Sequence, residues 1–336
     1  MTRFKALPQV SRRLESQLLR TARNCAMALA LPLLTGMAAT STTALAQTNN
    51  AAAPAIRPEV VKLLQASQDA LREGQLDKAL TLAQQAMAMP NISKDERPYV
   101  LRSLAAAAMQ AKNFVLAIST LETLVQELPD TTLPDQRTAL IESILSAAQQ
   151  AQDLERFVKW ARIYLDQGGR NPSVRPVLIQ TLSVLKQHEA VIKEVKVKIK
   201  SDEEYSVNTP EIELRLMAYS QRMLKDDAGY NASLKMLLQR YPSKAYWAEV
   251  IPRVARQANF NIRFDLDLYR LLELTGNMED PTEYTDMANL ALKNGLPAEA
   301  ARVVELAFSS GIFGKGSDVA NQQKLRQQVQ QKLNED

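Results

Sequence analysis

The sequence predicts an all-α fold built from repeated helix pairs, and three observations lead to this prediction. The 336 residues include only 10 glycines and are rich in Ala, Leu and Gln, a composition that favours helices. Apolar residues recur at helical spacing in short segments that are separated by turn signals. The pattern itself also recurs, because the small residue in the second helix of one unit, Ala79, returns 38 residues later as Ala117.

The unit 98–130 shows the pattern most clearly. Its first segment repeats apolar residues at i, i+3, i+4 and i+7, beginning at Leu101. Lys112-Asn113 marks a turn, and Ala117 lies on the apolar face of a second segment. Neither helix can bury its apolar stripe alone, so we expect the pair to pack against neighbouring pairs.

These positions resemble the tetratricopeptide repeat (TPR). The matching residues of this unit are Leu101, Leu104, Ala105, Ala108, Ala117, Leu121, Leu124 and Pro129. The resemblance implies an α-solenoid of about seven TPR-like helix pairs, which binds protein segments and needs no cofactor. We expect the pairs at 60–90, 98–130, 138–168, 172–200, 209–242, 244–276 and 281–311, followed by a polar, Gln-rich capping helix within 317–336.

Two local assignments need a choice. Residues 195–200 alternate apolar and basic side chains like a strand, but Ile192, Val195 and Ile199 also share a helix face. The helical surroundings favour a helix. Further along, Thr209 before Pro210 predicts an N-cap followed by proline in the first turn of a helix.

The N-terminal residues 1–46 have the features of an export signal. A long basic region precedes the apolar stretch Cys25–Met37, and Ala44-Leu45-Ala46 is a typical cleavage site, so Gln47 is the expected first residue of the exported chain. The apolar stretch is short for a membrane span, although a retained anchor is the alternative. We expect a flexible lead at 47–57, N-terminal repeats at 58–205 and C-terminal repeats with the capping helix at 206–336.

Removal of this signal changes the charge of the protein. The full chain has 41 Lys/Arg and 37 Asp/Glu, a net charge of +4, but six of the basic residues and one acidic residue lie in 1–46. The exported chain therefore has a net charge of −1, which gives no support for nucleic-acid binding. It also has no cysteine and one histidine, His188, which excludes thiol catalysis and any metal site with two histidines.

The C-terminal repeats carry a more specific resemblance. The stretch 241–247 (YPSKAYW), the stretch 268–276 (LYRLLELTG) and the stretch 284–300 with its Ala, Gly and Pro positions resemble periplasmic repeat proteins of Gram-negative bacteria that are associated with TonB energy-transduction systems. This resemblance covers about residues 210–312. It implies a periplasmic, non-enzymatic protein that assists TonB, its motor subunits or an outer-membrane receptor.

Candidate partner-binding residues follow from the repeat positions. In TPR proteins, positions 2, 5, 9 and 12 of each first helix face the concave side. With Ala232 as the small residue in the second helix of the fifth pair, the candidates are Tyr99, Arg102, Met109, Met217, Gln221, Leu224, Asp286 and Asn289. Tyr246, Trp247, Tyr269 and Tyr284 are a second set, an aromatic strip for a peptide, although burial between helices is the competing interpretation.

Three further features have weaker functional interpretations. The stretch 311–317 contains Gly-Lys-Gly-Ser but lacks phosphate-loop spacing, so we expect a helix end and a connection. The acidic groups at 265–267 and 279–283 could serve acid–base catalysis, but no second group converges on them in the predicted helices. His188 is expected at an exposed turn.

These observations predict a protein-binding scaffold, with an accessory role in a TonB-dependent transport system as the first hypothesis. A scaffold for envelope biogenesis, such as peptidoglycan or exopolysaccharide assembly, shares the same fold and is the first alternative. A glycan-processing enzyme is the second alternative, and the shortage of histidine and of converging acids argues against it. No membrane span is expected after the signal is cleaved.

Overall fold

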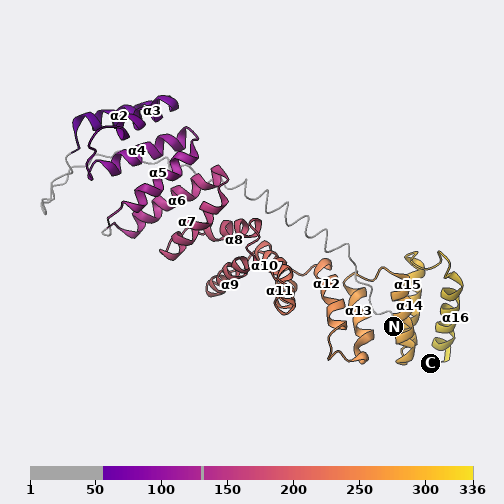
Figure 1. Cartoon of the computed structure of the whole chain (residues 1–336). Coiled ribbons are helices and arrows are strands. Elements are labelled where there is room, and N and C mark those ends of the chain that lie inside the picture. The colour runs from indigo at the N-terminus through magenta and orange to yellow at the C-terminus, as the bar shows by residue number, and fades with distance from the viewer. Residues whose placement is uncertain (1–55, 130–131, 336) are drawn as a thin grey trace, which may run out of the picture. The chain divides into compact units, whose positions relative to one another are not determined.

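The computed structural model describes residues 56–129 and 132–335, and these residues fold almost entirely into helices (Figure 1). The described part of the chain contains fifteen α-helices, one short 3-10 helix and no strand, which confirms the all-α prediction. Residues 195–200 belong to a helix. The predicted export signal and most of the lead at 47–57 lie outside the described residues.

The helices form seven pairs followed by one final helix, as predicted. The bounds of the pairs are α2 (Pro58–Arg72) with α3 (Leu76–Met87), α4 (Arg97–Gln110) with α5 (Phe114–Gln126), α6 (Pro134–Ala151) with α7 (Leu154–Asp166), α8 (Val174–Val184) with α9 (His188–Glu204), α10 (Glu211–Met223) with α11 (Asp227–Arg240), α12 (Lys244–Ala255) with α13 (Asp265–Leu274), and α14 (Pro281–Lys293) with α15 (Pro297–Ser309). The final helix is α16 (Val319–Glu335), and η1 (Ile262–Phe264) lies between α12 and α13.

The chain divides into two compact units between Lys198 and Ile199, within α9. We call residues 56–198 the N-terminal unit and residues 199–335 the C-terminal unit. Within each unit, consecutive helices pack against one another along the chain, so α3 contacts α4, α5 contacts α6, α11 contacts α12 and α13 contacts α14. This packing gives every helix pair the neighbours that its apolar stripe requires.

Six of the seven pairs use the same turn between their two helices. Just after the first helix, a single residue has a positive φ, between 56° and 74°. The N–H of the residue that follows it donates to the carbonyl five positions earlier in the chain, at 2.8–2.9 Å. This is the geometry in which helices end with a left-handed residue, usually glycine. The left-handed residues are Gly74, Lys112, Gln152, Lys186, Lys225 and Gly295. Only two of them are glycine, so four pairs accept a side chain in a conformation that disfavours it.

The turn fixes which side chains of the first helix are buried. If the left-handed residue is numbered 15, the helices α4, α6 and α10 all bury positions 3, 4, 7, 8, 10 and 11. In α4 these positions are Val100, Leu101, Leu104, Ala105, Ala107 and Ala108. Position 20, in the second helix, is also buried, and there Ala79 and Ala117 let the two backbones approach closely.

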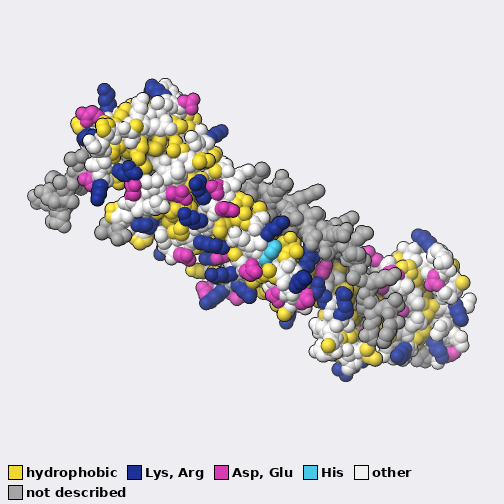
Figure 2. Space-filling model, viewed as in Figure 1, with side chains coloured by type: hydrophobic (Ala, Val, Ile, Leu, Met, Phe, Trp, Pro, Cys, Tyr) yellow, Lys and Arg dark blue, Asp and Glu magenta, His cyan; other side chains and the backbone are white. Residues whose placement is uncertain are grey.

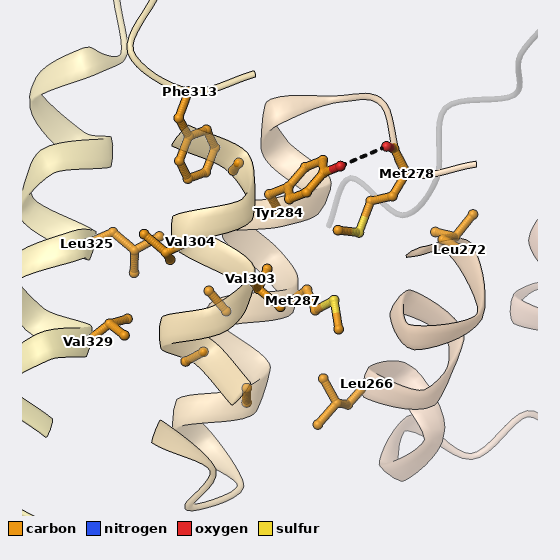
Figure 3. Packing of buried hydrophobic residues seen from close by; sticks show 14 of the residues in the cluster. Leu266, Leu272, Met278, Tyr284, Met287, Val303, Val304, Phe313, Leu325 and Val329 are labelled. Carbon is orange, nitrogen blue, oxygen red and sulfur yellow. Dashed lines mark hydrogen bonds between the residues drawn. The ribbon is translucent and has the colours of Figure 1, made fainter. Parts of the chain in front are cut away.

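The core of the C-terminal unit joins α12 to α16 (Figure 3). Tyr284 lies at its centre, where its hydroxyl donates to the carbonyl oxygen of Met278 at 3.1 Å and its ring meets Phe313 edge-on at 6.2 Å between centroids. From α16, Leu325 and Val329 point toward Val303 and Val304 of α15, as Figure 3 shows. The final helix therefore covers the last pair, as a capping helix should.

Side-chain bonds also tie successive pairs together. At the start of α2, Arg57 donates its backbone N–H and Nε to Oε1 of Glu96, and its Nη2 to Oε2, at 2.8–2.9 Å. Glu96 precedes α4 and its side chain is 1% exposed. These bonds hold the pKa of Glu96 well below its ordinary value of 4.5, at about 2, because the carboxylate accepts from Arg57 and from the Ser93 backbone.

One predicted cap is wrong. The residue before α10 is Pro210, and no side chain caps this helix. Thr209 is buried instead, and its backbone carbonyl accepts a hydrogen bond from Tyr241 Oη at 2.9 Å. The residue that sequence rules assign to the cap is therefore used to hold the chain against the end of α11.

Glycine at position 112 should stabilise the N-terminal unit. Lys112 has φ 58° and is exposed, so Lys112→Gly removes the left-handed strain and loses little packing. We expect the free energy of unfolding to rise by about 1 kcal/mol in urea titrations, because a non-glycine residue is strained in this region by more than the additional chain entropy that glycine loses on folding. Lys112→Ala is the matched control because it removes the same side chain and keeps the strain; an equal gain from alanine contradicts this explanation.

Glu96 should make the N-terminal unit sensitive to acid. A carboxylate whose pKa is lowered on folding stabilises the fold above its ordinary pKa, and this contribution is lost as the pH falls from about 4.5 toward 2. Glu96→Gln should therefore unfold at a lower temperature than the wild type at neutral pH, with a smaller further loss in acid. Thermal melts of both proteins across this pH window test the prediction. If the melting temperatures of the two proteins fall by the same amount as the pH is lowered, the prediction is contradicted.

Candidate partner-binding surface

In five of the seven first helices, α2, α4, α6, α10 and α14, the residues opposite the main buried face form a stripe along the helix. Positions 2, 5, 9, 12 and 13 lie within one arc of a helix, opposite the six buried positions. We call them the first-helix stripe. Its residues are Val61, Leu64, Gln68, Leu71 and Arg72 in α2; Tyr99, Arg102, Ala106, Met109 and Gln110 in α4; Ala139, Glu142, Ser146, Gln149 and Gln150 in α6; Ile212, Arg215, Tyr219, Arg222 and Met223 in α10; and Thr282, Thr285, Asn289, Leu292 and Lys293 in α14.

The stripe is most apolar on α2 and α4, which contact each other directly. Tyr99 is 44% exposed and Met109 is half-buried, so both remain accessible there, while Leu64 and Leu71 are half-buried because they also pack against the core. Figure 2 shows hydrophobic side chains gathered over these helices. Such a patch on first helices that pack side by side is a suitable surface for an apolar segment of another protein.

Arg102 is the cation of this patch. It is exposed, and among the described residues no carboxylate pairs with it, whereas Arg57, Arg72 and Arg97 of the same two pairs all hold a carboxylate. An unpaired guanidinium beside Tyr99 offers a partner both hydrogen-bond donors and a positive charge. The patch therefore combines apolar contact with one polar anchor, which is typical of interface centres.

The stripe becomes polar on α6. Glu142 occupies position 5, and its Oε1 accepts a hydrogen bond from the hydroxyl of Tyr164 at 2.5 Å. The same hydroxyl accepts from the backbone N–H of Asn171 at 2.8 Å. Burial and the neighbouring Glu142 carboxylate raise the pKa of Tyr164. Glu142 is thus engaged in holding α7, and the apolar patch belongs to the first two pairs.

Two candidates in the fifth pair are buried rather than exposed. Met217 is 1% exposed and Gln221 is 3% exposed, and the Gln221 Oε1 accepts a hydrogen bond from Ser233 Oγ at 2.6 Å. Counted from the left-handed Lys225, they occupy the buried positions 7 and 11. The expected register used Ala232, which is exposed. The residue at position 20 is Tyr230, two residues earlier, which is 6% exposed.

The third candidate of that pair, Leu224, is 39% exposed but lies outside the stripe, at the C-cap of α10. The residues that the corrected register places on the stripe of this helix are Arg215, Tyr219 and Arg222, together with Ile212 and Met223. Sequence analysis missed them because the turn at Lys225 contains no glycine or asparagine.

The aromatic residues do not form one strip. Tyr246 is 5% exposed, and its hydroxyl donates to Glu211 Oε1 at 2.5 Å, so it joins α12 to α10. Tyr269 is half-buried and donates to Oδ2 of Asp286 at 3.0 Å, so these two candidates bind each other. Burial raises the pKa of both tyrosines well above the ordinary value. Tyr284 is buried as the packing interpretation expects, while Trp247 is half-buried. Asn289 is exposed on the stripe of α14, whereas Asp286 is exposed at position 6, outside the stripe.

The acidic groups have structural partners. Asp267 and Glu299 both accept from Arg270, at 2.8 and 2.5 Å. Asp280 is the N-cap of α14, in a capping box with Glu283. Among the described residues, no three His, Cys, Asp or Glu side chains are grouped so that they could hold a metal ion.

His188 and the stretch 311–317 both lie at helix ends. His188 is the first residue of α9 and is half-buried rather than exposed. The stretch 311–317 follows α15, begins with the left-handed Gly311 and buries Phe313, so it is a helix end and a connection. Across residues 56–129 and 132–335, no helix combines the length and apolar character that crossing a membrane requires.

No protein-family model and no curated protein matches the sequence. Among solved structures, the chain is similar to the TPR2AB domain of yeast Sti1 in complex with an HSP90 peptide, with 17% identity, a TM-score of 0.41 and coverage of 81% of this chain and 98% of that one. A tetratricopeptide repeat protein of Parabacteroides merdae has 12% identity, a TM-score of 0.36 and coverage of 81% and 99%. Yeast Tom70 has 12% identity, a TM-score of 0.30 and coverage of 80% and 67%.

Substitutions on the two sides of a first helix should differ sharply in their effect on stability. Met217→Ala deletes a fully buried side chain and should lower the free energy of unfolding by about 2–5 kcal/mol. Arg102→Ala removes an exposed stripe residue and should change it by no more than about 0.5 kcal/mol. Urea unfolding of both variants tests the register. If Met217→Ala leaves the free energy of unfolding unchanged, Met217 is exposed as the sequence predicted, and the observed register is contradicted.

Proposed function

We propose that this protein is a non-enzymatic scaffold that binds a segment of another protein on the first-helix stripe of α2 and α4. The observation that carries the proposal is the accessible apolar patch around Tyr99 and Met109, together with the exposed Arg102, which pairs with no carboxylate of residues 56–129 and 132–335. A rigid, pre-formed surface of this kind binds without the cost of ordering itself. The structural use of Asp267, Asp280 and Glu299 supports the absence of a catalytic role for these groups.

The chemistry of the patch defines the partner. A segment that is extended or helical, with apolar side chains at regular spacing and one carboxylate, can cover Tyr99 and Met109 and pair with Arg102. The net charge of −1 that remains without residues 1–46 supports a protein partner rather than nucleic acid.

We also propose that the chain is exported to the periplasm of a Gram-negative bacterium and assists a TonB-dependent transport system. The signal features of residues 1–46 support export, and the resemblance across residues 210–312 supports the TonB association. TonB itself or one of its motor subunits is then the candidate source of the bound segment. A scaffold for envelope biogenesis is the alternative that the same experiment separates.

Photo-crosslinking in cells tests the binding surface. A photoreactive amino acid in place of Tyr99 should yield a crosslinked partner, and the same amino acid in place of Gln84, which is exposed on α3, should not. Arg102→Glu should reduce the Tyr99 adduct about tenfold, the effect expected for loss of a charge-assisted hydrogen bond. The recovered chain should begin at Gln47.

Identification of the adduct separates the hypotheses. TonB or its motor subunits in the adduct support the transport role, and cell-wall synthases alone favour envelope biogenesis. An absent Tyr99 adduct, or equal yields from positions 99 and 84, contradicts the proposed surface. A recovered chain that still begins at Met1 contradicts cleavage of the signal.

A further inference from the structure

The C-terminal unit has two edges of different character. The connections within pairs, taken with the helix-end residues that flank them, span 223–228, 256–264 and 293–296, and we call them the turn edge. The connections between pairs, again with flanking helix-end residues, span 203–210, 241–244, 275–281 and 310–318, and form the return edge. Figure 1 shows the α12–α13 and α14–α15 connections at the same lower edge, since α12 and α14 run in the same direction.

Every connection of the turn edge exposes large apolar side chains. Their exposed fractions are 45% for Met223, 39% for Leu224, 63% for Ile262, 42% for Phe264 and 38% for Leu296. A single exposed apolar residue needs no explanation, but a row that spans three successive pairs does. These side chains lie at helix ends and connections, so core packing does not require them.

The α12–α13 connection contributes most to this row. It is the one pair among the described helices without the left-handed turn, and it uses the longer stretch 256–264 with the 3-10 helix η1. The Arg263 guanidinium carbon lies 4.6 Å from the ring centroid of Phe264, and Arg256 donates its Nε to the carbonyl oxygen of Pro252 at 2.9 Å. Neither arginine pairs with a carboxylate among the described residues.

The two edges carry opposite charge. The turn edge exposes four basic side chains and two acidic ones: Lys225, Arg256, Arg263 and Lys293 against Asp226 and Asp227. The return edge exposes five acidic side chains and two basic ones: Glu203, Glu204, Glu279, Asp280 and Asp318 against Lys244 and Lys315. Asp226 is also the N-cap of α11, where its carboxylate accepts the backbone N–H of Gly229 at 2.9 Å and lies at the positive end of the helix. Both edges expose apolar side chains, since Tyr205 (78%) and Val207 (57%) lie on the return edge and Leu274 (84%) lies beside it. The turn edge differs in charge, because its apolar side chains are interleaved with basic residues rather than acidic ones.

We infer that the turn edge binds the surface of an anionic lipid bilayer. Apolar side chains interleaved with Lys and Arg are the composition of surfaces that lie in the interfacial region of membranes, with the rings and methyl groups below the headgroups and the cations at the phosphates. A row along an edge presents side chains outward, which suits a broad, flat surface better than a single peptide. The acidic return edge then faces away from the lipid.

This inference does not depend on the partner proposed for α2 and α4, since no residue is shared. The binding is peripheral and reversible. Each basic residue near an anionic surface contributes roughly fivefold to the affinity, and the contribution weakens as salt screens the charges.

A fluorescent probe placed at each edge tests the inference with the full chain. Cys25 is the one cysteine of the sequence, so Cys25→Ser allows a single new cysteine to be labelled with an environment-sensitive dye. Ile262→Cys reports the turn edge, and Leu274→Cys, 84% exposed, is the matched control beside the return edge. The probe reads local insertion, so any membrane binding by residues 1–46 does not produce the expected difference.

Vesicles that contain phosphatidylglycerol should shift the emission of the probe at position 262 to shorter wavelength, and vesicles of phosphatidylcholine alone should not. The probe at 274 should respond to neither. Arg256→Gln with Arg263→Gln should raise the lipid concentration for half the response on the order of thirtyfold. No shift at 262, an equal shift at 274, or the same shift with phosphatidylcholine alone would overturn the inference.

Discussion

The structure depends on one constraint, which is that each first helix must reverse into its partner with its apolar face inward, a face that comprises the same six positions in α4, α6 and α10. A left-handed residue at position 15 closes the turn in six pairs, and the hydrogen bond behind it fixes the phase of the helix. Because the turn and the buried positions are a fixed number of residues apart, the turn also determines which side chains remain outside. The partner-binding stripe is therefore a consequence of turn geometry as much as of composition.

The sequence predicts the pairs well where the helices approach through alanine. Position 20 is Ala79, Ala117 and Ala300 in three pairs, and there the predicted and observed faces agree. In other pairs the same position is Phe157, Val191 or Tyr230, all no more than 6% exposed. The residue at position 20 is always buried, but its size varies among the pairs. A pattern that requires alanine there selects Ala232 in place of Tyr230 and shifts the register of the fifth pair by two residues. Turn rules based on glycine do not single out the left-handed lysines and glutamine, because their strain is tolerated only within the packed pair; the turn at Lys112 is predicted with the help of the Asn113 that follows it.

Most of what the sequence could not show about the acidic residues lies in contacts between pairs. Arg270 and Glu299 are 29 residues apart, and Arg302 and Glu273 have the same separation in the opposite sense. Both bonds join α13 to α15, the second helices of adjacent pairs. The acidic groups at 265–267 and 279–283 resemble catalytic groups in the sequence. In the fold, Asp267 pairs with Arg270 of its own helix, Asp280 caps α14, and Glu279 pairs with Lys244 of the preceding helix pair. Long-range partners of this kind have no local signal, so the sequence predicts the helices but not the ties between them.

The sequence predicts the net charge of the protein, but not how the fold distributes basic and acidic side chains over its surface. The balance of basic and acidic residues beyond position 46 is nearly even, which argues against a strongly charged protein, yet the fold of the C-terminal unit collects unlike charges on opposite edges. Turns within pairs and connections between pairs alternate along the chain. Basic and acidic segments therefore alternate in the sequence, and their charges largely cancel in the net charge of the chain.

The patch on α2 and α4 lies in the other compact unit. A chain that holds a protein segment with one unit and a lipid surface with the other raises the local concentration of each ligand near the other without any conformational signal. Such a protein acts as a scaffold simply because its two binding units belong to one polypeptide chain.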